Sequence, residues 1–184
     1  MPLPLGHTAI GLAVYDLSHK NNCATNRLAL AVLIVFLTNL PDVDIVIGIL
    51  FRGNEGVFHR GPTHSLLFAI SMGFLVANAW RLSSHIPRMD FTTCVLLIIS
   101  HVAADFLFTS SPVSFFWPLE LNWVGGCGGW GDVMIPVFLQ NYREAAILTV
   151  CGIIILLNRM ITQSHHPAFL WNLHKRAGKA SEVG

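Results

Sequence analysis

Histidine and aspartate residues interrupt two otherwise apolar stretches of this sequence. His101 and Asp105 lie within FTTCVLLIISHVAADFLFT, and Asp42 and Asp44 lie within LALAVLIVFLTNLPDVDIVIGILF. A spacing of four residues puts His101 and Asp105 on one face of a helix, one turn apart. This arrangement suits two ligands of one metal ion, or an aspartate that orients a histidine ligand. A neutral core histidine bonded to its aspartate is the alternative that this pair alone leaves open.

Asp42 and Asp44 follow Pro41, which has no backbone N–H and predicts a kink or an unwound turn. In a regular helix the two carboxylates would diverge by about 200°, whereas an unwound turn lets both point inward. Without such a turn, one aspartate ligates and the other supports it. The alternative is a helix N-terminus that Asn39 caps, with the aspartates in its first turn.

The motif HRGPTHS, at residues 59–65, brings His59, Arg60 and His64 close together in the sequence. Pro62 suits the first turn of a new helix. The free N–H groups of a helix start can receive a phosphate, and Arg60 could hold the same anion through two hydrogen bonds. Ser65 could cap the helix or contact the phosphate. The alternative is a polar loop before a capped helix.

Together these positions form a candidate metal-binding set. Its members are His7, Asp42, Asp44, His59, His64, His101 and Asp105. Imidazole and carboxylate without thiolate suit zinc, manganese or iron, and the four cysteines show no CxxC spacing. The set predicts one or two divalent ions, with zinc preferred. For catalysis, we expect His64 at the metal, Asp44 as a ligand or general base, and Arg60 as the group that stabilises an anion.

Composition indicates where these residues lie. The chain has 184 residues, of which 53% are hydrophobic and only 11% are charged, and its mean hydropathy is +0.60. Soluble domains carry roughly a quarter charged residues, so we expect a lipid bilayer to cover this surface. A charge at mid-bilayer costs about 3 kcal/mol or more, which favours a cation as the partner of the buried carboxylates. A net charge of +1 argues against a nucleic-acid partner.

The apolar segments predict an all-α, polytopic membrane bundle with four or five transmembrane helices. The expected segments are 6–19, 28–51, 63–81, 91–109 and 145–158. The first is too short to span by itself. We expect one membrane-embedded domain over 1–160 and a basic tail over 161–184. The connection at 110–144 is rich in tryptophan and glycine, which suits a membrane interface or a lid.

Positive charges predict the orientation of this bundle. Eight lysine and arginine residues fall on one side of the expected spans and three, Arg52, Arg60 and Arg143, on the other. The side with more positive charge is expected to be cytoplasmic. The 52–63 loop would then face outward.

The order of the motifs resembles the YdjM family of bacterial inner-membrane, LexA-regulated, metal-dependent hydrolases. The matching elements are GHTAIG with His7, PDVD at 41–44, HRGPTHS at 59–65 and HVAAD at 101–105. The order of these ligands is also similar, more distantly, to zinc-dependent phospholipase C and the P1-type nucleases, whose later His-x-x-x-Glu pair has no counterpart after Asp105. Asp132 is a candidate late member of the site. The resemblance implies a multi-pass protein of the bacterial inner membrane.

The resemblance also implies a hydrolase in which metal-activated water cleaves a phosphoester of a lipid or another membrane-accessible substrate. A metal-binding membrane protein or a transporter without hydrolase activity is the main alternative, because it too would place ionisable residues in the membrane. A haem cytochrome would place histidines on facing helices without the aspartates. An intramembrane zinc protease would be expected to carry the HExxH motif, which this sequence lacks.

Overall fold

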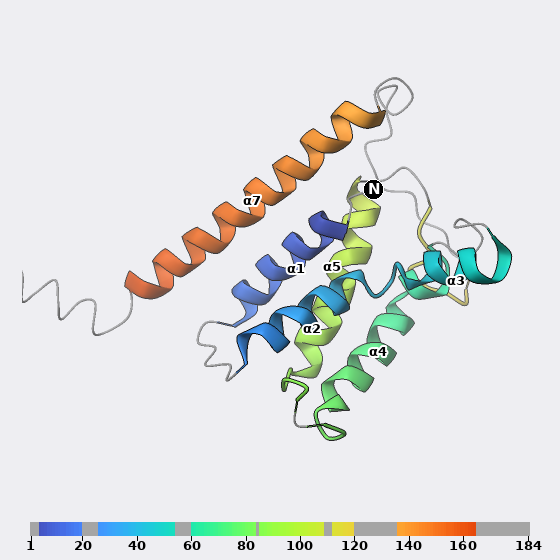
Figure 1. Cartoon of the computed structure of the whole chain (residues 1–184), viewed down its shortest axis with the longest axis horizontal. Coiled ribbons are helices and arrows are strands. Elements are labelled where there is room, and N and C mark those ends of the chain that lie inside the picture. Colours follow the sequence, from blue (N-terminus) through green and yellow to red (C-terminus); the bar gives the residue numbers. More distant parts are fainter. Residues whose placement is uncertain are drawn as a thin grey trace, which may run out of the picture.

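Helices account for nearly all the regular structure in the computed structural model of this chain, which describes residues 4–19, 26–53, 60–83, 85–108, 112–119 and 136–164 (Figure 1). The α-helices are α1 (Pro4–Ser18), α2 (Arg27–Asn39), α3 (Val43–Arg52), α4 (Leu66–Ala79), α5 (Phe91–Phe108) and α7 (Pro136–Ser164). A short 3-10 turn, η1 (Pro62–His64), precedes α4. The described residues contain no strand, so the predicted all-α fold is confirmed.

The second apolar segment is broken where the sequence predicts a kink. It forms α2 and α3, whose axes are bent by 60° at a break on either side of Pro41. Because Pro41 cannot donate to the carbonyl four residues earlier, the helical ladder ends there. Asn26 caps the start of α2 by accepting from the Ala29 amide at 3.0 Å. The break leaves the last carbonyls of α2 available to partners outside the helix.

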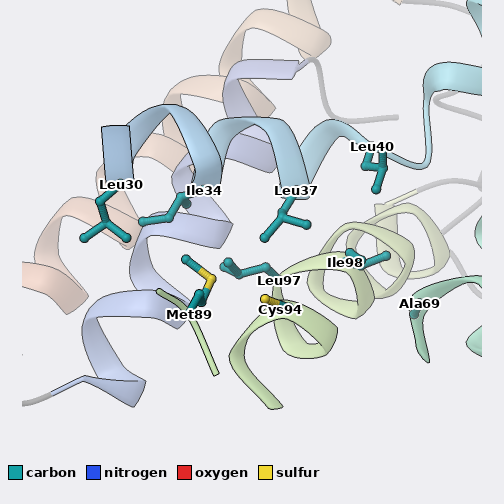
Figure 2. Packing of buried hydrophobic residues seen from close by; sticks show 9 residues of the cluster. All are labelled: Leu30, Ile34, Leu37, Leu40, Ala69, Met89, Cys94, Leu97 and Ile98. Carbon is teal, nitrogen blue, oxygen red and sulfur yellow. The ribbon is translucent and has the colours of Figure 1, made fainter. Parts of the chain in front are cut away.

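Helix α5 lies among α1, α2 and α4 and contacts all three (Figure 1). Leu37 from α2 and Leu97, Ile98 and Cys94 from α5 are fully buried in the main apolar cluster (Figure 2). Apolar packing between α2 and α5 therefore fixes the position of α5, the helix that carries His101 and Asp105.

Helices α1 and α2 approach closely at Gly11. A Cβ placed on Gly11 would collide with the Thr38 side chain, whereas a Cβ on Gly152 of α7 would meet no atom within 4 Å. Glycine is therefore required at position 11 for steric reasons, because a side chain there would push α1 away from α2.

This contrast predicts opposite effects of one substitution at two glycines. Gly11→Ala should destabilise the protein by about 1–3 kcal/mol, because it overpacks the contact with Thr38. Gly152→Ala should stabilise it by up to about 1 kcal/mol, because alanine favours the helix and meets open space. Thermal unfolding of both variants in detergent measures the difference. A Gly11→Ala protein as stable as Gly152→Ala would contradict the close approach.

The C-terminal ends of α1 and α7 are held together by polar contacts. Asn158 Nδ2 donates to the Asp16 backbone oxygen and to Asp16 Oδ2, both at 2.9 Å. Arg159 Nε lies 3.1 Å from Asp16 Oδ1. Ala13 of α1 packs with Ile147 and Cys151 of α7 further along the same pair. These contacts place α7 beside α1, on the outside of the bundle (Figure 1).

Two helices of the described residues are long and apolar enough to cross a membrane by themselves. They are α5 and the Tyr142–Thr162 part of α7, and the bent pair α2–α3 qualifies as a third if it counts as one span. Helix α4 is apolar but shorter, and its 14 residues extend about 21 Å, less than the roughly 30 Å of hydrocarbon. The structure thus supports two or three candidate spans, fewer than the four or five predicted.

The last helix is longer than the apolar stretch at 145–158 predicts. It begins at Pro136 and ends at Ser164, because helices do not stop where apolar residues stop: Arg143 and Glu144 favour the helical state without being apolar. The predicted 110–144 connection is correspondingly shorter. Trp117 in its first part is 40% exposed, while Trp123 and Trp130 lie outside the described residues, as does the tail from residue 165.

Candidate metal centre

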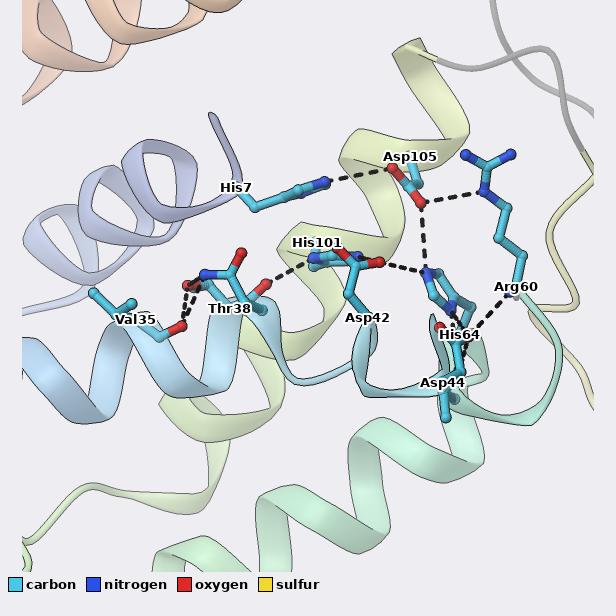
Figure 3. Close-up of polar contacts among 11 residues, drawn as sticks. His7, Val35, Thr38, Asp42, Asp44, Arg60, His64, His101 and Asp105 are labelled. Atoms are coloured by element: carbon cyan, nitrogen blue, oxygen red, sulfur yellow. Dashed lines mark hydrogen bonds and ion pairs between the residues drawn. The ribbon is translucent and has the colours of Figure 1, made fainter. Parts of the chain in front are cut away.

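Four polar side chains from three parts of the chain converge at one end of the bundle (Figure 3). Asp42 comes from the break between α2 and α3, His64 from η1, and His101 and Asp105 from the C-terminal half of α5. One ligand atom from each lies within 4.8 Å of all the others. His64, His101 and Asp105 are fully buried, and the Asp42 side chain is 14% exposed. This is the geometry of a candidate site for one metal ion.

Histidine nitrogens and carboxylate oxygens face one another across this cluster. His101 Nε2 lies 3.3 Å from Asp42 Oδ1, and His64 Nε2 lies 3.4 Å from Asp105 Oδ2 and 3.8 Å from Asp42 Oδ1. The predicted pairing of His101 with Asp105 on one face of α5 is realised, but the two side chains contact different partners within one shared site.

The second nitrogen of His101 fixes its protonation pattern. His101 Nδ1 lies 2.7 Å from the Thr38 carbonyl oxygen, which can only accept, so Nδ1 carries the proton. In the neutral imidazole Nε2 then has a lone pair, and it faces the Asp42 carboxylate without forming a hydrogen bond to any described residue. A cation between the two atoms satisfies both, which is how metal-binding histidines are arranged. The residues therefore fit a metal ion.

His64, like His101, is held by contacts of its Nδ1 atom, which here faces Asp44 and Thr63. Its Nδ1 lies 3.4 Å from Asp44 Oδ2 and 3.2 Å from Thr63 Oγ1. Its Nε2 lies 3.4 Å from Asp105 Oδ2, so a carboxylate lies against each ring nitrogen. Two carboxylates beside one imidazole favour a metal cation at this place.

Asp44 lies beside the four-residue cluster and not within it. Its Oδ2 accepts a hydrogen bond from Thr63 Oγ1 at 2.6 Å and from the Arg60 backbone N–H at 3.1 Å. The break at Pro41 thus directs Asp42 to the cluster and Asp44 to the segment that carries His64. Asp44 therefore contacts Thr63 and the Arg60 backbone beside His64, and its predicted roles of ligand and general base stay predictions.

Removing the Thr63 hydroxyl should weaken metal binding without touching a ligand. In Thr63→Val the side chain keeps its shape, but Asp44 loses its 2.6 Å hydrogen bond from the Thr63 hydroxyl and His64 is held less firmly. Metal affinity should fall about 10-fold to 100-fold, as is usual when groups that orient ligands are lost. Competition with a chelating dye measures this fall. Thr149→Val on the exposed face of α7 is the matched control, and an equal loss there would refute the orienting role.

Arg60 is the one basic side chain in contact with the cluster among the described residues. It is 8% exposed, and its Nε lies 3.3 Å from Asp105 Oδ2. Its backbone is left-handed, with φ 64°, a conformation that costs a non-glycine residue roughly 1–2 kcal/mol. Hydrogen bonds from Arg60 N–H to Asp44 and from Ser114 N–H to the Arg60 oxygen hold this conformation. The predicted pairing of Arg60 with the site is therefore present in the geometry.

His7 lies next to the cluster, at the start of α1. Its ring stacks on His101 with centroids 3.7 Å apart, and its Nε2 is 3.5 Å from Asp105 Oδ1. The ring is fully buried, and neither nitrogen forms a hydrogen bond within the described part of the chain. Asp105 consequently faces His64 and Arg60 with one oxygen and His7 with the other.

Carboxylates gather in the described part of this site. Those of Asp42, Asp44 and Asp105 lie here beside the guanidinium of Arg60. Carboxylates in an apolar interior need positive partners. A divalent cation would stabilise these carboxylates.

Two predicted members, His59 and Asp132, lie outside the described residues. Two contributors were not predicted, the Thr38 carbonyl and the Thr63 hydroxyl. A backbone carbonyl has no sequence signal of its own, although Thr63 does lie inside the HRGPTHS motif.

Apolar candidate spans and a buried cluster of histidine and aspartate define a membrane protein with a possible metal site. Residues 1–166 match the model of the family described as YdjM inner membrane protein. The chain belongs to this family, as the resemblance in its motifs predicts. No curated protein and no solved structure matches the chain. The likeness to zinc-dependent phospholipase C and P1-type nucleases stays a prediction.

Proposed function

We propose that this protein is a membrane-bound, metal-dependent hydrolase that cleaves a phosphoester of a lipid or another membrane-accessible compound. The observation that carries the proposal is the convergence of Asp42, His64, His101 and Asp105 on one point inside an apolar bundle. The lone pair on His101 Nε2, which faces a carboxylate, supports a cation at that point.

These four residues would hold one divalent ion, preferably zinc, with manganese or iron as alternatives. Such an ion supplies a nucleophile at neutral pH by lowering the pKa of bound water, and it polarises a phosphoryl oxygen. His7 and the Oδ1 atom of Asp105 support a second ion in the same site. His59 is a further ligand in this proposal.

Arg60 would bind and orient the phosphoryl group. Its guanidinium belongs to a buried side chain and approaches the cluster at Asp105, and a planar guanidinium matches two phosphate oxygens. Asp44 would keep His64 and the Arg60 backbone in place, since its Oδ2 atom already accepts hydrogen bonds from Thr63 and Arg60. Ser65 would cap α4, where its Oγ accepts from the Phe68 amide at 3.1 Å.

We further propose that residues 1–160 form one domain with four or five membrane crossings, whose metal centre faces the non-cytoplasmic side. The ends of α1 and α7 opposite the site are held together at Asp16. Arg27, Arg81 and Arg88 adjoin helix termini at that same end, since α2 and α5 begin there and α4 ends there. The concentration of positive charge at this end supports a cytoplasmic location for it.

Elemental analysis and hydrolysis by the same purified protein test the proposed function. The full chain in detergent should contain about one divalent ion or more per molecule and should hydrolyse a generic phosphodiester such as bis-(4-nitrophenyl) phosphate. His64→Ala should lose both properties, because it removes a ligand. His85→Ala, at an exposed histidine in the connection between α4 and α5, should lose neither property. Activity that survives His64→Ala would overturn the assignment.

A metal-binding membrane protein or transporter without hydrolase activity is the second candidate. It is favoured by the same buried cluster, because ionisable residues inside membranes often line ion pathways. The clustering of the ligands at one end of the bundle supports a site over a path across the membrane. Tightly bound metal with no turnover of any phosphoester, ester or amide would favour this candidate.

A further inference from the structure

Two residues that line an apolar pocket directly follow metal-ligand candidates in the sequence, and the proposed function gives this pocket no role. It has a volume of about 90 Å³ and is lined by Ser65, Leu66, Ile99, Val102, Phe115 and Phe116. We infer that this pocket binds the aliphatic chain of a lipid whose phosphoester group lies at the metal centre. The inference rests on the proposed function and narrows its substrate class to phosphoesters that carry an alkyl chain.

The pocket begins within one residue of two metal-ligand candidates. Ser65 directly follows His64, and Val102 directly follows His101; consecutive Cα atoms are about 3.8 Å apart. The pocket wall and the candidate metal centre are therefore built from neighbouring residues of the same two segments.

The segment 112–119 joins the pocket wall to Arg60. The Ser114 amide donates to the Arg60 carbonyl oxygen at 3.3 Å, and the Leu66 amide donates to the Phe115 carbonyl oxygen at 2.9 Å. Phe115 also packs edge-to-face on Phe106 of α5, with ring centroids 5.3 Å apart. The proposed anion-binding residue and the aromatic wall of the pocket are therefore held by one short piece of chain.

The lining of the pocket suits a hydrocarbon chain. Five of its six lining residues are apolar, and the Ser65 hydroxyl is already used, because it donates to the Pro62 oxygen at 2.6 Å and accepts from the Phe68 amide. A sugar or a nucleobase placed here would lose its hydrogen bonds to water without replacement. An alkyl chain loses none.

A separate, shallow apolar groove lies further along the outside of α4. It has a volume of about 440 Å³, and its lining includes Ile70, Phe74 and Phe91. Leu66, Ile70 and Phe74 are four residues apart, so they share one face of α4. From Leu66 to Phe74 that face extends about 12 Å, towards the start of α5 (Figure 1). A chain longer than the pocket could continue along this face.

Binding of non-hydrolysable alkylphosphonates tests the chain site separately from hydrolysis. We would measure the affinity of methyl-, butyl- and octylphosphonate for the zinc-loaded full chain in lipid nanodiscs. In the wild-type protein, affinity should rise up to about fourfold for each added CH₂ that the pocket buries. The Ile99→Trp side chain would fill the pocket. This variant should bind octylphosphonate at least about 10-fold more weakly, while its affinity for methylphosphonate and its zinc content should not change.

Leu96→Trp is the matched control, because Leu96 is on the same helix but faces outward with 41% exposure. It should leave the octylphosphonate affinity unchanged. Phe116→Ala, at a wall residue that is 47% exposed, should weaken the binding of octylphosphonate about threefold or more. An equal loss in Leu96→Trp, or no loss in both pocket variants, would overturn the inference, because chain binding would then reflect partition into the bilayer alone.

The two proposals fail in distinguishable ways. Chain-selective binding without turnover of any phosphoester would refute the hydrolase and leave the chain site standing. Turnover with equal affinity for all three phosphonates would refute the chain site and leave the hydrolase standing.

Discussion

The Asp105→Asn variant is expected to lose its metal and its phosphoester hydrolysis while still inserting into the membrane. Asp105 contacts three other side chains of the centre. Its Oδ2 lies 3.4 Å from His64 Nε2 and 3.3 Å from Arg60 Nε, and its Oδ1 lies 3.5 Å from His7 Nε2. The amide has nearly the same shape but carries no charge, and its NH₂ group cannot ligate. Metal affinity should fall more than about 100-fold, since a fall of 10-fold to 100-fold is usual for groups that only orient ligands.

The matched control is Asp90→Asn, which removes one carboxylate at the opposite end of α5. Asp90 caps that helix by accepting from the Thr93 amide at 2.8 Å, and asparagine is an equally good cap. Burial raises the pKa of Asp90, but the hydrogen bonds from Thr93 outweigh it and hold that pKa below its ordinary value. Both variants thus remove a charged group of the same kind.

Elemental analysis, chelator competition and phosphoester hydrolysis are measured for both proteins. Asp90→Asn should match the wild type in all three. An Asp105→Asn protein with wild-type metal content and affinity would show that the cluster at the end of α5 is not the metal site.

The helices and the broken span were predictable because local chemistry decides them. Pro41 interrupts the hydrogen bonds of a helix in any surroundings, since the missing N–H is a property of the residue itself. The spacing of His101 and Asp105 places them on one face of any helix. Apolar segments likewise predicted where helices lie, although Arg143 and Glu144 extend α7 beyond its apolar part.

The partners of each ligand could not be predicted, because they depend on distances between segments far apart in the sequence. The spacing of four suggested that Asp105 could orient His101, whereas the structure gives His101 the Thr38 carbonyl and Asp42, and gives Asp105 the side chains of His64, Arg60 and His7. The sequence left open whether Asp42 and Asp44 both ligate or whether one ligates and the other supports it. In the structure, the turn at Pro41 directs the Asp42 side chain towards the other ligand candidates and the Asp44 side chain towards Thr63. The Gly11 contact with Thr38, which brings α1 beside α2, is equally invisible in the sequence.

Removal of the metal should lower the thermal stability of the wild-type protein. The site holds the carboxylates of Asp42, Asp44 and Asp105 in a mostly buried place, and carboxylates in an apolar interior are stabilised by a cation. An ion that binds only the folded state stabilises it by about 4 kcal/mol when its free concentration is about 1,000 times the dissociation constant. For a chain of this size that corresponds to about 8–16 °C in the unfolding midpoint.

The midpoint should therefore rise with the logarithm of free zinc in a buffered titration, followed by tryptophan fluorescence in detergent, and excess chelator should reverse the rise. Asp105→Asn should show little of this response. That variant keeps the tail histidines His165, His166 and His174, so zinc bound at the tail would affect both proteins equally. A zinc response of the same size in the variant would place the stabilising ion outside the centre. If the response is confined to the wild type, a buried site that contains Asp105 binds the ion, and the same titration gives its affinity.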